Sequence, residues 1–336
     1  MSIAEFDVIA NYFSQDFPKR SDVVLGVGDD AALCSIPSDK QLVVAVDTLI
    51  ENVHFPLKTR PEDIGYKALA VNLSDMAAMG ATPAWMTLAL TCPHIDETWL
   101  SKFSSGLREL AESSKVSLIG GDTTSGPLTI TIQIMGFVTP NSALQRSGAK
   151  SGDGIYVTGT VGDAGLGLAS IEKRLVLARP LQKFVESRLH RPTPRLAEGK
   201  ALRGIASSAI DISDGLAADL GHILTASGVG ATIETDKLPL SSALRDSLSA
   251  ETAWNFALSS GDDYELCFTV PKDKERDLQD ALPVNSYTRI GTIERRTGLR
   301  CISSNGRMFM PQESGYEHFI KLNIGATPRK RRSRSR

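Results

Sequence analysis

Acidic residues at the edges of apolar segments constrain this chain more than any other feature of its sequence. The first example is Gly26–Ala32, where Asp29 and Asp30 stand side by side between glycines and apolar residues. Adjacent carboxylates repel each other, and a divalent cation relieves the repulsion when they face a partly buried cleft. The arrangement recurs along the chain, at Asp47, Asp75, Asp122, Asp211, Asp214 and Asp262–Asp263. We therefore expect the fold to gather these distant segments into one site.

Strand-like and helical segments alternate through the first half of the chain. Leu42–Val46 is apolar and largely β-branched, which predicts a buried strand with Asp47 at its end. Pro61 and the acids after it predict the start of a helix that Gly80 ends, with Asp75 on its inward face. Further strands are predicted at 84–91, 116–119 and 129–138, and a further helix at 96–115. This succession is typical of an α/β fold.

The length of 336 residues favours two domains rather than one core. A glycine- and serine-rich stretch at 145–154 marks the junction. We predict an N-terminal domain at 1–140, a C-terminal α/β domain at 150–322 and a basic tail at 323–336. The turn Gly159–Gly167 follows a strand and opens a helix, so it either holds a phosphate through backbone N–H groups or is an ordinary tight turn.

Charge is unevenly distributed between the body and the tail. The formal net charge is −2, and six basic residues lie between 328 and 336, which leaves −8 for the rest. An acidic body argues against specific nucleic-acid binding, whereas the tail is expected to be disordered and at most a weak polyanion contact. The first residues do not resemble a signal peptide and no apolar run has membrane-spanning length, so we expect no membrane partner and a cytoplasmic protein.

The residue types at the expected site favour magnesium over zinc. The five histidines are dispersed and the four cysteines show no CxxC spacing, whereas carboxylates are plentiful. Mg²⁺ prefers carboxylate and water oxygens and is usually shared with substrate phosphates. Neither the P-loop pattern nor the protein-kinase motifs are present. Arg146, in the junction, either stabilises phosphate charge or is a surface residue.

Seven motifs, in order and spacing, resemble those of one known family. They are Gly26–Ala32, Asp47 with Asn52–Phe55, Asn72–Ala84, Gly120–Thr123, Asp211–Leu216, Gly261–Leu266 and Gly315–Phe319. Together they are similar to the thiamine-monophosphate kinase family, part of the aminoimidazole-ribonucleotide synthetase-like ATP-binding superfamily. The resemblance spans about residues 3–320.

The resemblance implies a fold, a reaction and a set of site residues. The fold is a two-domain α/β (α+β) architecture, in which an N-terminal sheet domain forms a homodimer and a C-terminal α/β sandwich completes the active site. The reaction is ATP-dependent phosphorylation of thiamine monophosphate to thiamine diphosphate, the final step of thiamine diphosphate biosynthesis, with several Mg²⁺ ions. The implied metal ligands are Asp30, Asp47, Asp75, Asp122, Asp211 and Asp214, of which Asp30, Asp75 and Asp211 serve catalysis. The implied ATP contacts are Gly121, Asp122, Arg146 and Ser213, and the implied thiamine phosphate contacts are His54, Asp262 and Tyr316.

The chain departs from the family pattern at two places. Ala45 and Val46 stand where hydroxyl residues usually precede the acid at Asp47, and Asp262 stands where the family usually has glutamate. Two alternatives therefore stay open: another ATP-dependent synthetase of the superfamily, and a catalytically silent thiamine-phosphate-binding protein. For the kinase we expect direct in-line transfer without a strong general base or a phospho-enzyme, since the attacking phosphate is already anionic.

Overall fold

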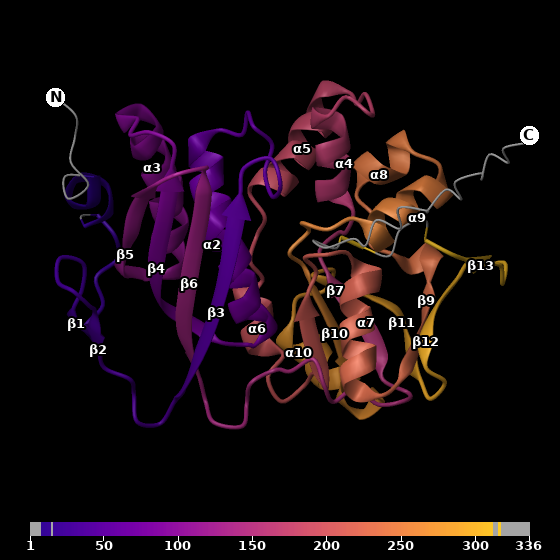
Figure 1. Ribbon diagram of the computed structural model, residues 1–336. Helices are drawn as coiled ribbons and strands as arrows, with labels where there is room; N and C mark the ends of the chain where they lie inside the picture. Colours follow the sequence, from indigo (N-terminus) through magenta and orange to yellow (C-terminus); the bar gives the residue numbers. More distant parts are fainter. Residues whose placement is uncertain (1–7, 15, 312–314, 317–336) are drawn as a thin grey trace, which may run out of the picture.

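Two β-sheets lie side by side in the computed structural model and carry most of the chain (Figure 1). The structure describes residues 8–14, 16–311 and 315–316. The first sheet has the order β3-β6-β4-β5, and the second has the order β13-β12-β9-β11-β7-β10-β8. The first sheet consists of β3 (Gln41–Ile50), β4 (Thr82–Cys92), β5 (Ser117–Ser125) and β6 (Thr129–Val138). The fold class predicted from the sequence is confirmed.

Helices α2 (Pro61–Ala78) and α3 (Glu97–Ser114) cover one face of the first sheet. The sequence predicted both helices. Proline stands at the start of α2, and the Asp96 carboxylate accepts hydrogen bonds from two backbone N–H groups at the start of α3. Glycine at 106 lets the two helices pack so closely that a Cβ there would lie only 1.8 Å from the carbonyl oxygen of Glu62. The core between sheet and helices includes Leu69, Met76, Phe103 and Ile132.

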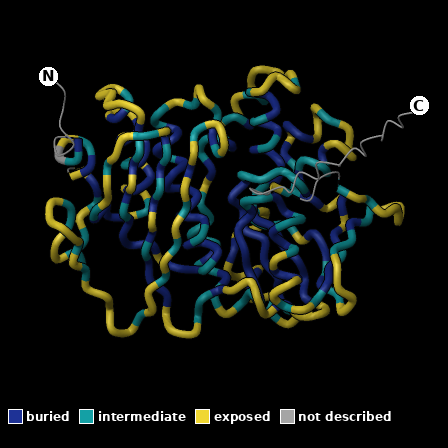
Figure 2. The backbone as a smooth tube through the Cα atoms, in the orientation of Figure 1, coloured by how far each residue is buried: buried dark blue, intermediate teal, exposed yellow. Residues whose placement is uncertain are grey.

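The opposite face of the first sheet is open to solvent along β3. Leu42, Val44, Val46 and Ile50 alternate along the strand and are 41%, 49%, 60% and 39% exposed. Figure 2 shows this alternation of exposed and more buried positions. A short hairpin of β1 (Val23–Leu25) and β2 (Leu33–Cys34) packs on this face against a small cluster that includes Trp85, Ile119 and Phe137.

The second sheet forms the centre of the C-terminal half. Its strands are β7 (Gly154–Thr158), β8 (Ser208–Asp211), β9 (Gly230–Glu234), β10 (Leu266–Val270), β11 (Tyr287–Glu294), β12 (Gly298–Ile302) and β13 (Met308–Phe309). The helices of this half are α4 (Asp163–Ile171), α5 (Arg179–His190), α6 (Leu196–Ala201), α7 (Leu216–Ser227), α8 (Ser242–Ser247), α9 (Ala250–Ser259) and α10 (Glu275–Ala281). Short turns of other helix types occur at η1 (Ile9–Phe13), η2 (Thr235–Lys237) and η3 (Lys272–Lys274).

Two acids lie inside strands rather than at strand ends, which corrects the sequence prediction. β3 continues to Ile50, so Asp47 is an interior residue of the strand. β5 continues through the glycines to Ser125, so Asp122 is also interior. Polar residues such as Thr48 and Thr123 continue the ladder because backbone pairing with β6 and β4, rather than apolar character, decides where these strands stop.

The segment after α5 ties the two halves together. Arg191 donates to Asp63 of α2 at 2.7 Å and to both carboxylate oxygens of Glu109 of α3 at 2.9 Å. α2 also packs against α6 and β8 of the C-terminal half. Among the described residues, no helix combines the length and apolar character needed to cross a membrane.

Candidate active site between the two sheets

Three predicted metal ligands converge where α2 lies between the sheets. Asp47 comes from β3, Asp75 from α2 and Asp211 from the end of β8. Their carboxylates are close enough for their charges to interact, and the Ser74 hydroxyl donates to Asp211 at 2.7 Å. The structure thus brings together acids that are distant in the sequence, and their role as ligands stays a prediction.

Burial and mutual repulsion make these carboxylates hard to ionise without a cation. Burial, and next the charge of Asp211, raises the pKa of Asp47 to about 6. Burial, and next the charges of Asp211 and Asp47, raises the pKa of Asp75 to about 8. Burial likewise raises the pKa of Asp211, which is only 5% exposed. A bound cation would reverse these shifts because it favours the ionised form.

A second acidic group continues the site into the loop between β8 and α7. Ligand atoms of Asp214, Asp219 and His222 lie within 4.8 Å of one another. The Asp219 carboxylate accepts hydrogen bonds from the backbone N–H groups of Ser213, Asp214 and Gly215, at 3.0 to 3.1 Å. Burial and the nearby acids raise the pKa of Asp219 to about 7. The two carboxylates offer the oxygen donors that a hard divalent cation prefers, whereas the exposed imidazole is a ligand more typical of transition metals.

Arg146 provides positive charge beside this cluster. It is exposed, and its charge acts on Asp75 and Asp211 in the direction that lowers their pKa. The guanidinium therefore lies near enough to the acids for its charge to act on them. Of the two sequence interpretations of Arg146, this position favours the one in which it meets a phosphate bound between them.

The Asp262 loop pairs with the loop that carries Ser213. The backbone N–H of Asp262 donates to the Ser213 carbonyl at 2.9 Å, and that of Tyr264 donates to the Ile212 carbonyl at 2.8 Å. Gly261 permits this approach because a Cβ there would lie 2.2 Å from the Ser213 carbonyl oxygen. Asp262 and Tyr264 have φ values of 69° and 50°, which are unusual for residues with side chains. The loop is therefore strained and needs support from its neighbours.

The other two predicted substrate contacts lie on adjacent loops. The backbone N–H of Ile50 donates to Nδ1 of His54 at 3.0 Å, so Nδ1 is the unprotonated nitrogen of the neutral ring. Tyr316 is 49% exposed, and its backbone N–H donates to the Asp214 carbonyl at 2.9 Å. Tyr316 thus lies beside the acidic residue Asp214, whereas His54 lies in the loop after β3, beside Ile50.

Two predicted ligands lie apart from the cluster. Asp47, Ile132, Leu88 and Gly121 form one row across the sheet on its helix-covered face. Asp122 is the next residue after Gly121, so its side chain points to the open face. Within one subunit, therefore, the structure does not bring Asp122 to the other acids, because the side chains of a strand alternate between its two faces.

Asp30 is also separated from the cluster. It is exposed in the loop that joins β1 to β2, and the hairpin packs on the open face. The same alternation separates Ala45 and Val46, the two residues before Asp47 that depart from the family pattern. Ala45 shares the inner face with Asp47, whereas the side chain of Val46 points to the open face.

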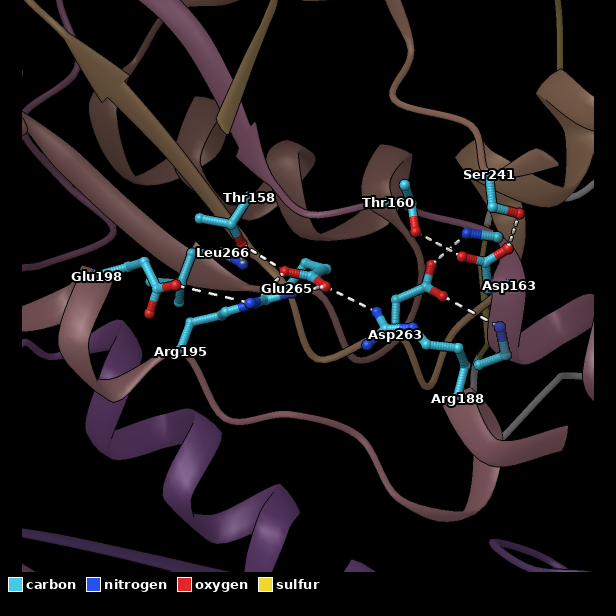
Figure 3. Close-up of polar contacts among 12 residues, drawn as sticks. Thr158, Thr160, Asp163, Arg188, Arg195, Glu198, Ser241, Asp263, Glu265 and Leu266 are labelled. Atoms are coloured by element: carbon cyan, nitrogen blue, oxygen red, sulfur yellow. Dashed lines mark hydrogen bonds and ion pairs between the residues drawn. The ribbon is translucent and has the colours of Figure 1, made fainter. Parts of the chain in front are cut away.

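The helix start after the glycine turn is already occupied by a carboxylate. Asp263, 1% exposed, accepts hydrogen bonds from the backbone N–H groups of Gly162 at 2.6 Å and Ala164 at 3.3 Å (Figure 3). Of the two interpretations of Gly159–Gly167, the ordinary tight turn therefore fits better than the phosphate-binding loop. Its N–H groups already anchor the loop that carries Asp262.

Glu265 supports the same loop from its other end. Its carboxylate accepts hydrogen bonds from Thr158 at 2.6 Å, Arg188 at 2.7 Å and Arg195 at 2.6 Å, as Figure 3 shows. The sequence analysis did not find this network around Glu265, to which Arg188 and Arg195 contribute from either side of the 191–194 segment. It also missed Ser74, Asp219 and Lys67, and only Asp219, an acid in the first turn of a helix, left a sequence signal.

Comparisons with known proteins place this site in a family. The model described as "AIR synthase related protein, N-terminal domain" matches residues 28–138, and its C-terminal counterpart matches residues 150–303. The chain is 49% identical over 322 residues to the thiamine-monophosphate kinase of Escherichia coli (strain K12), covering 95% of this chain and 99% of the relative. It is 37% identical over 331 residues to that of Bacillus subtilis (strain 168), covering 94% and 99%.

Solved structures agree with the sequence comparisons. The thiamine-monophosphate kinase from Stenotrophomonas maltophilia K279a superposes with a TM-score of 0.82 at 44% identity, covering 92% of this chain and 99% of that one. A structure described as AaThiL complexed with AMPPCP and TMP gives a TM-score of 0.75 at 32% identity, covering 87% and 92%. Hydrogenase maturation protein HypE, at 19% identity and a TM-score of 0.73, shares the fold alone. On sequence and structure together, the chain belongs to the thiamine-monophosphate kinase family.

Proposed function

We propose that this chain transfers the γ-phosphoryl group of ATP to thiamine monophosphate and releases thiamine diphosphate and ADP. The observation that carries the proposal is the convergence of Asp47, Asp75 and Asp211 between the two sheets, with Arg146 facing them. Relatives named thiamine-monophosphate kinase align with almost the whole chain, and their name identifies the substrate in this proposal.

The acidic cluster is the place where Mg²⁺ would bind. Asp47, Asp75, Asp211 and Asp214 would hold it, since these carboxylates lie close enough for their charges to interact and the positive charge of Arg146 acts on two of them. Mg²⁺ bound there would neutralise phosphate charge and keep the two anionic reactants in one geometry. The raised carboxyl pKa values of Asp47 and Asp75 support this assignment, because a bound cation would favour the ionised form that burial and neighbouring acids disfavour.

ATP would lie against the loop of Ser213, with Arg146 on its phosphates. A guanidinium matches phosphate oxygens in pairs, which suits a residue at the edge of the cleft. Gly121 shares the inner row of the sheet with Asp47, and a Cβ there would lie 1.9 Å from the Leu88 carbonyl oxygen. Only glycine therefore fits this part of the wall.

Thiamine monophosphate would lie between His54, Asp262 and Tyr316. Its thiazolium ring is a cation, which the Asp262 carboxylate complements, and Tyr316 offers a half-exposed aromatic ring beside it. The terminal phosphate oxygen attacks the γ-phosphorus in line, an O–P bond forms, and the bond to ADP breaks. The nucleophile is already anionic, so the residues need to align the reactants rather than remove a proton.

We also propose a homodimer whose two subunits share each site. The open face of β3, with Leu42, Val44, Val46 and Ile50 exposed, is an apolar surface that suits burial against a second copy. Asp30 and Asp122 lie on that face, on the side away from Asp47. β3 and β5 are the edge strands of the first sheet, so a second copy that also meets the β3 edge would bring the partner's Asp30 and the partner's Asp122 to the side of Asp47.

The division into domains is proposed on the same basis. The first sheet and its helices would form the ATP- and Mg²⁺-binding and dimerisation domain at 1–140. The second sheet would form the domain at 150–322 that completes the site, followed by the basic tail at 323–336, which lies outside the described residues. A reaction that consumes ATP also supports a cytoplasmic location.

The test is product analysis of the purified protein with ATP and Mg²⁺. Thiamine monophosphate is supplied in one reaction and free thiamine in the other. We expect thiamine diphosphate and ADP in equal amounts from the monophosphate, and no phosphorylated product from thiamine. Tight binding of the monophosphate without product would instead support the catalytically silent binding protein. The structural reason for that alternative is Ala45, which shares the inner face with Asp47.

A further inference from the structure

Lys67 is a buried cation that none of the family-derived assignments includes. It lies in the middle of α2, is 1% exposed and is one of the largest fully buried side chains among the described residues. Removing an ammonium group from water is costly unless the protein supplies charged and polar partners. The partners that Lys67 has in this structure therefore indicate why it is there.

Those partners are the two loops that carry predicted substrate contacts. Nζ of Lys67 lies 3.0 Å from Oδ1 of Asp262, in the loop before β10. The same Nζ donates to the backbone carbonyl of His54 at 3.2 Å, in the loop after β3. One ammonium group on α2 thus joins a loop of the N-terminal half to a loop of the C-terminal half.

The geometry at Asp262 leaves one carboxylate oxygen for a ligand. The Tyr264 hydroxyl donates at 3.1 Å to Oδ1, the same oxygen that meets Lys67. The Asp262 side chain is still 30% exposed, so its second oxygen can face a bound molecule. Because Asp262 and Tyr264 adopt strained positive φ values, the loop depends on such contacts to keep its conformation.

We propose that Lys67 is a positioning residue for the thiamine phosphate subsite, acting through Asp262 and the His54 loop. The proposal rests on the proposed function for the identity of the substrate. Lys67 sets the separation of the two loops and the orientation of the Asp262 carboxylate. It acts on the phosphate acceptor and leaves the ATP subsite, formed by other loops, unchanged.

The kinetic test uses Lys67→Met in the full-length protein, which keeps the length of the side chain and removes its charge. We expect KM for thiamine monophosphate to rise roughly 10- to 100-fold, as for the loss of a hydrogen bond to a charged group, with KM for ATP within about twofold of wild type. Leu69→Ala is the control, because it makes a cavity in the same helix and its apolar side chain has no hydrogen bond or ion pair to lose with either loop. Equal changes in both KM values, or the same pattern in Leu69→Ala, would overturn the proposal.

A double variant tests whether Lys67 acts through Asp262. In an Asp262→Asn background, Lys67→Met should raise KM for thiamine monophosphate by no more than about threefold, because the charge that it held is gone. If the two effects multiply in full, Lys67 and Asp262 act independently and the positioning role is wrong.

Hydrogen exchange tests the Lys67 clamp, by which we mean the contacts of Lys67 with the His54 and Asp262 loops, without any substrate. The backbone N–H groups of His54 and Asp262 are both hydrogen-bonded in the structure. In Lys67→Met we expect both to exchange at least about tenfold faster, while α3 amides keep their wild-type rates. Unchanged exchange in the two loops would overturn the clamp. Absence of kinase product in the wild type would overturn the proposed function alone, since the exchange result decides the clamp by itself.

Discussion

At the scale of single residues, the site is a balance between burial and charge. Asp47, Asp75 and Asp219 are carboxyl groups whose pKa is raised to about 6, about 8 and about 7. The cause is burial first, with neighbouring acids second. Such a cluster weakens the protein when it is ionised and empty, and it binds cations for the same reason. Stability and function therefore oppose each other at these residues.

The sign of the pH dependence follows from the raised pKa values. A folded state that holds protons above the ordinary aspartate pKa loses stability as pH rises through about 6 to 8. We expect the free energy of unfolding, measured by denaturant titration in the presence of a chelator, to be lower at pH 8.5 than at pH 5.5. His190, whose pKa burial lowers, acts in the opposite direction over part of this window.

Asp75→Asn separates the two contributions. In this variant the free energy of unfolding should decrease less as pH rises, because the carboxyl with the highest of the three raised pKa values is gone. At pH 8.5, added Mg²⁺ should raise the free energy of unfolding of the wild-type protein, and it should raise that of Asp75→Asn by a smaller amount. If the free energy of unfolding of the wild-type protein, measured with a chelator present, rose steadily from pH 5.5 to 8.5, this result would contradict the raised pKa values of these carboxyl groups.

At the scale of elements, α2 organises the site. It covers the first sheet, contacts β8 and α6 of the other half, and carries Lys67, Ser74 and Asp75 toward the cluster. Its position is set by a close crossing with α3. A Cβ on Gly65 would lie 2.1 Å from the Phe103 carbonyl oxygen, and one on Gly106 would lie 1.8 Å from that of Glu62.

We predict that Gly106→Ala destabilises the protein by about 1–3 kcal/mol, because the added methyl group meets rigid backbone and forces the helices apart. Activity should fall as well, since α2 moves relative to Asp47 and Asp211. Gly221→Ala is the matched control. This glycine is also inside a helix, α7, but a Cβ there has no atom within 4 Å.

The control should stabilise by about 0.5–1 kcal/mol, as expected when alanine replaces glycine in a helix without a clash. Both values come from denaturant titrations of the two variants beside wild type. If Gly106→Ala were as stable as Gly221→Ala, the close crossing would not be what positions α2.

At the scale of the whole molecule, the question is how Asp30 and Asp122 reach the other acids. Both lie on the open face of the first sheet, and Asp47 points away from it. A site shared between subunits would resolve this conflict at the β3 edge of the sheet, where the partner's Asp30 and the partner's Asp122 would reach the side of Asp47 without moving any strand. The exposed apolar residues of β3 supply the surface that would hold the two copies together.

Co-expression of two inactive variants tests the shared site. Asp30→Asn and Asp75→Asn should each lower kcat by at least about 100-fold as homodimers. If each site draws Asp30 from one subunit and Asp75 from the other, the mixture should recover about a quarter of wild-type activity, because half of the dimers are hybrids and each hybrid has one intact site.

A pair from one cluster is the control for this experiment. Asp75→Asn mixed with Asp211→Asn should recover nothing, since both residues belong to the cluster of one subunit. Val46→Glu, which places a charge on the open face, should abolish dimers in light scattering and the recovery with them. Recovery in a monomeric sample, or none in the first mixture, would argue that Asp30 acts within its own chain.

The sequence by itself determined the local elements and the chemical type of the site. α2, α3 and the four strands of the first sheet lie close to where apolar patterns, proline and acidic residues predict them, because these signals act within a few residues. The abundance of aspartates at the edges of apolar segments also indicated a cation and phosphate site. Family motifs then identified the reaction.

Only the tertiary structure decided which of these residues meet. Asp47 and Asp122 differ by face because strand pairing, rather than sequence, set the register of β3, β4 and β5. Lys67, Asp263 and Glu265 became buried partners because their contacts join segments far apart in the chain. A local pattern carries no information about such contacts, since their energy depends on what the folded chain places opposite each charge.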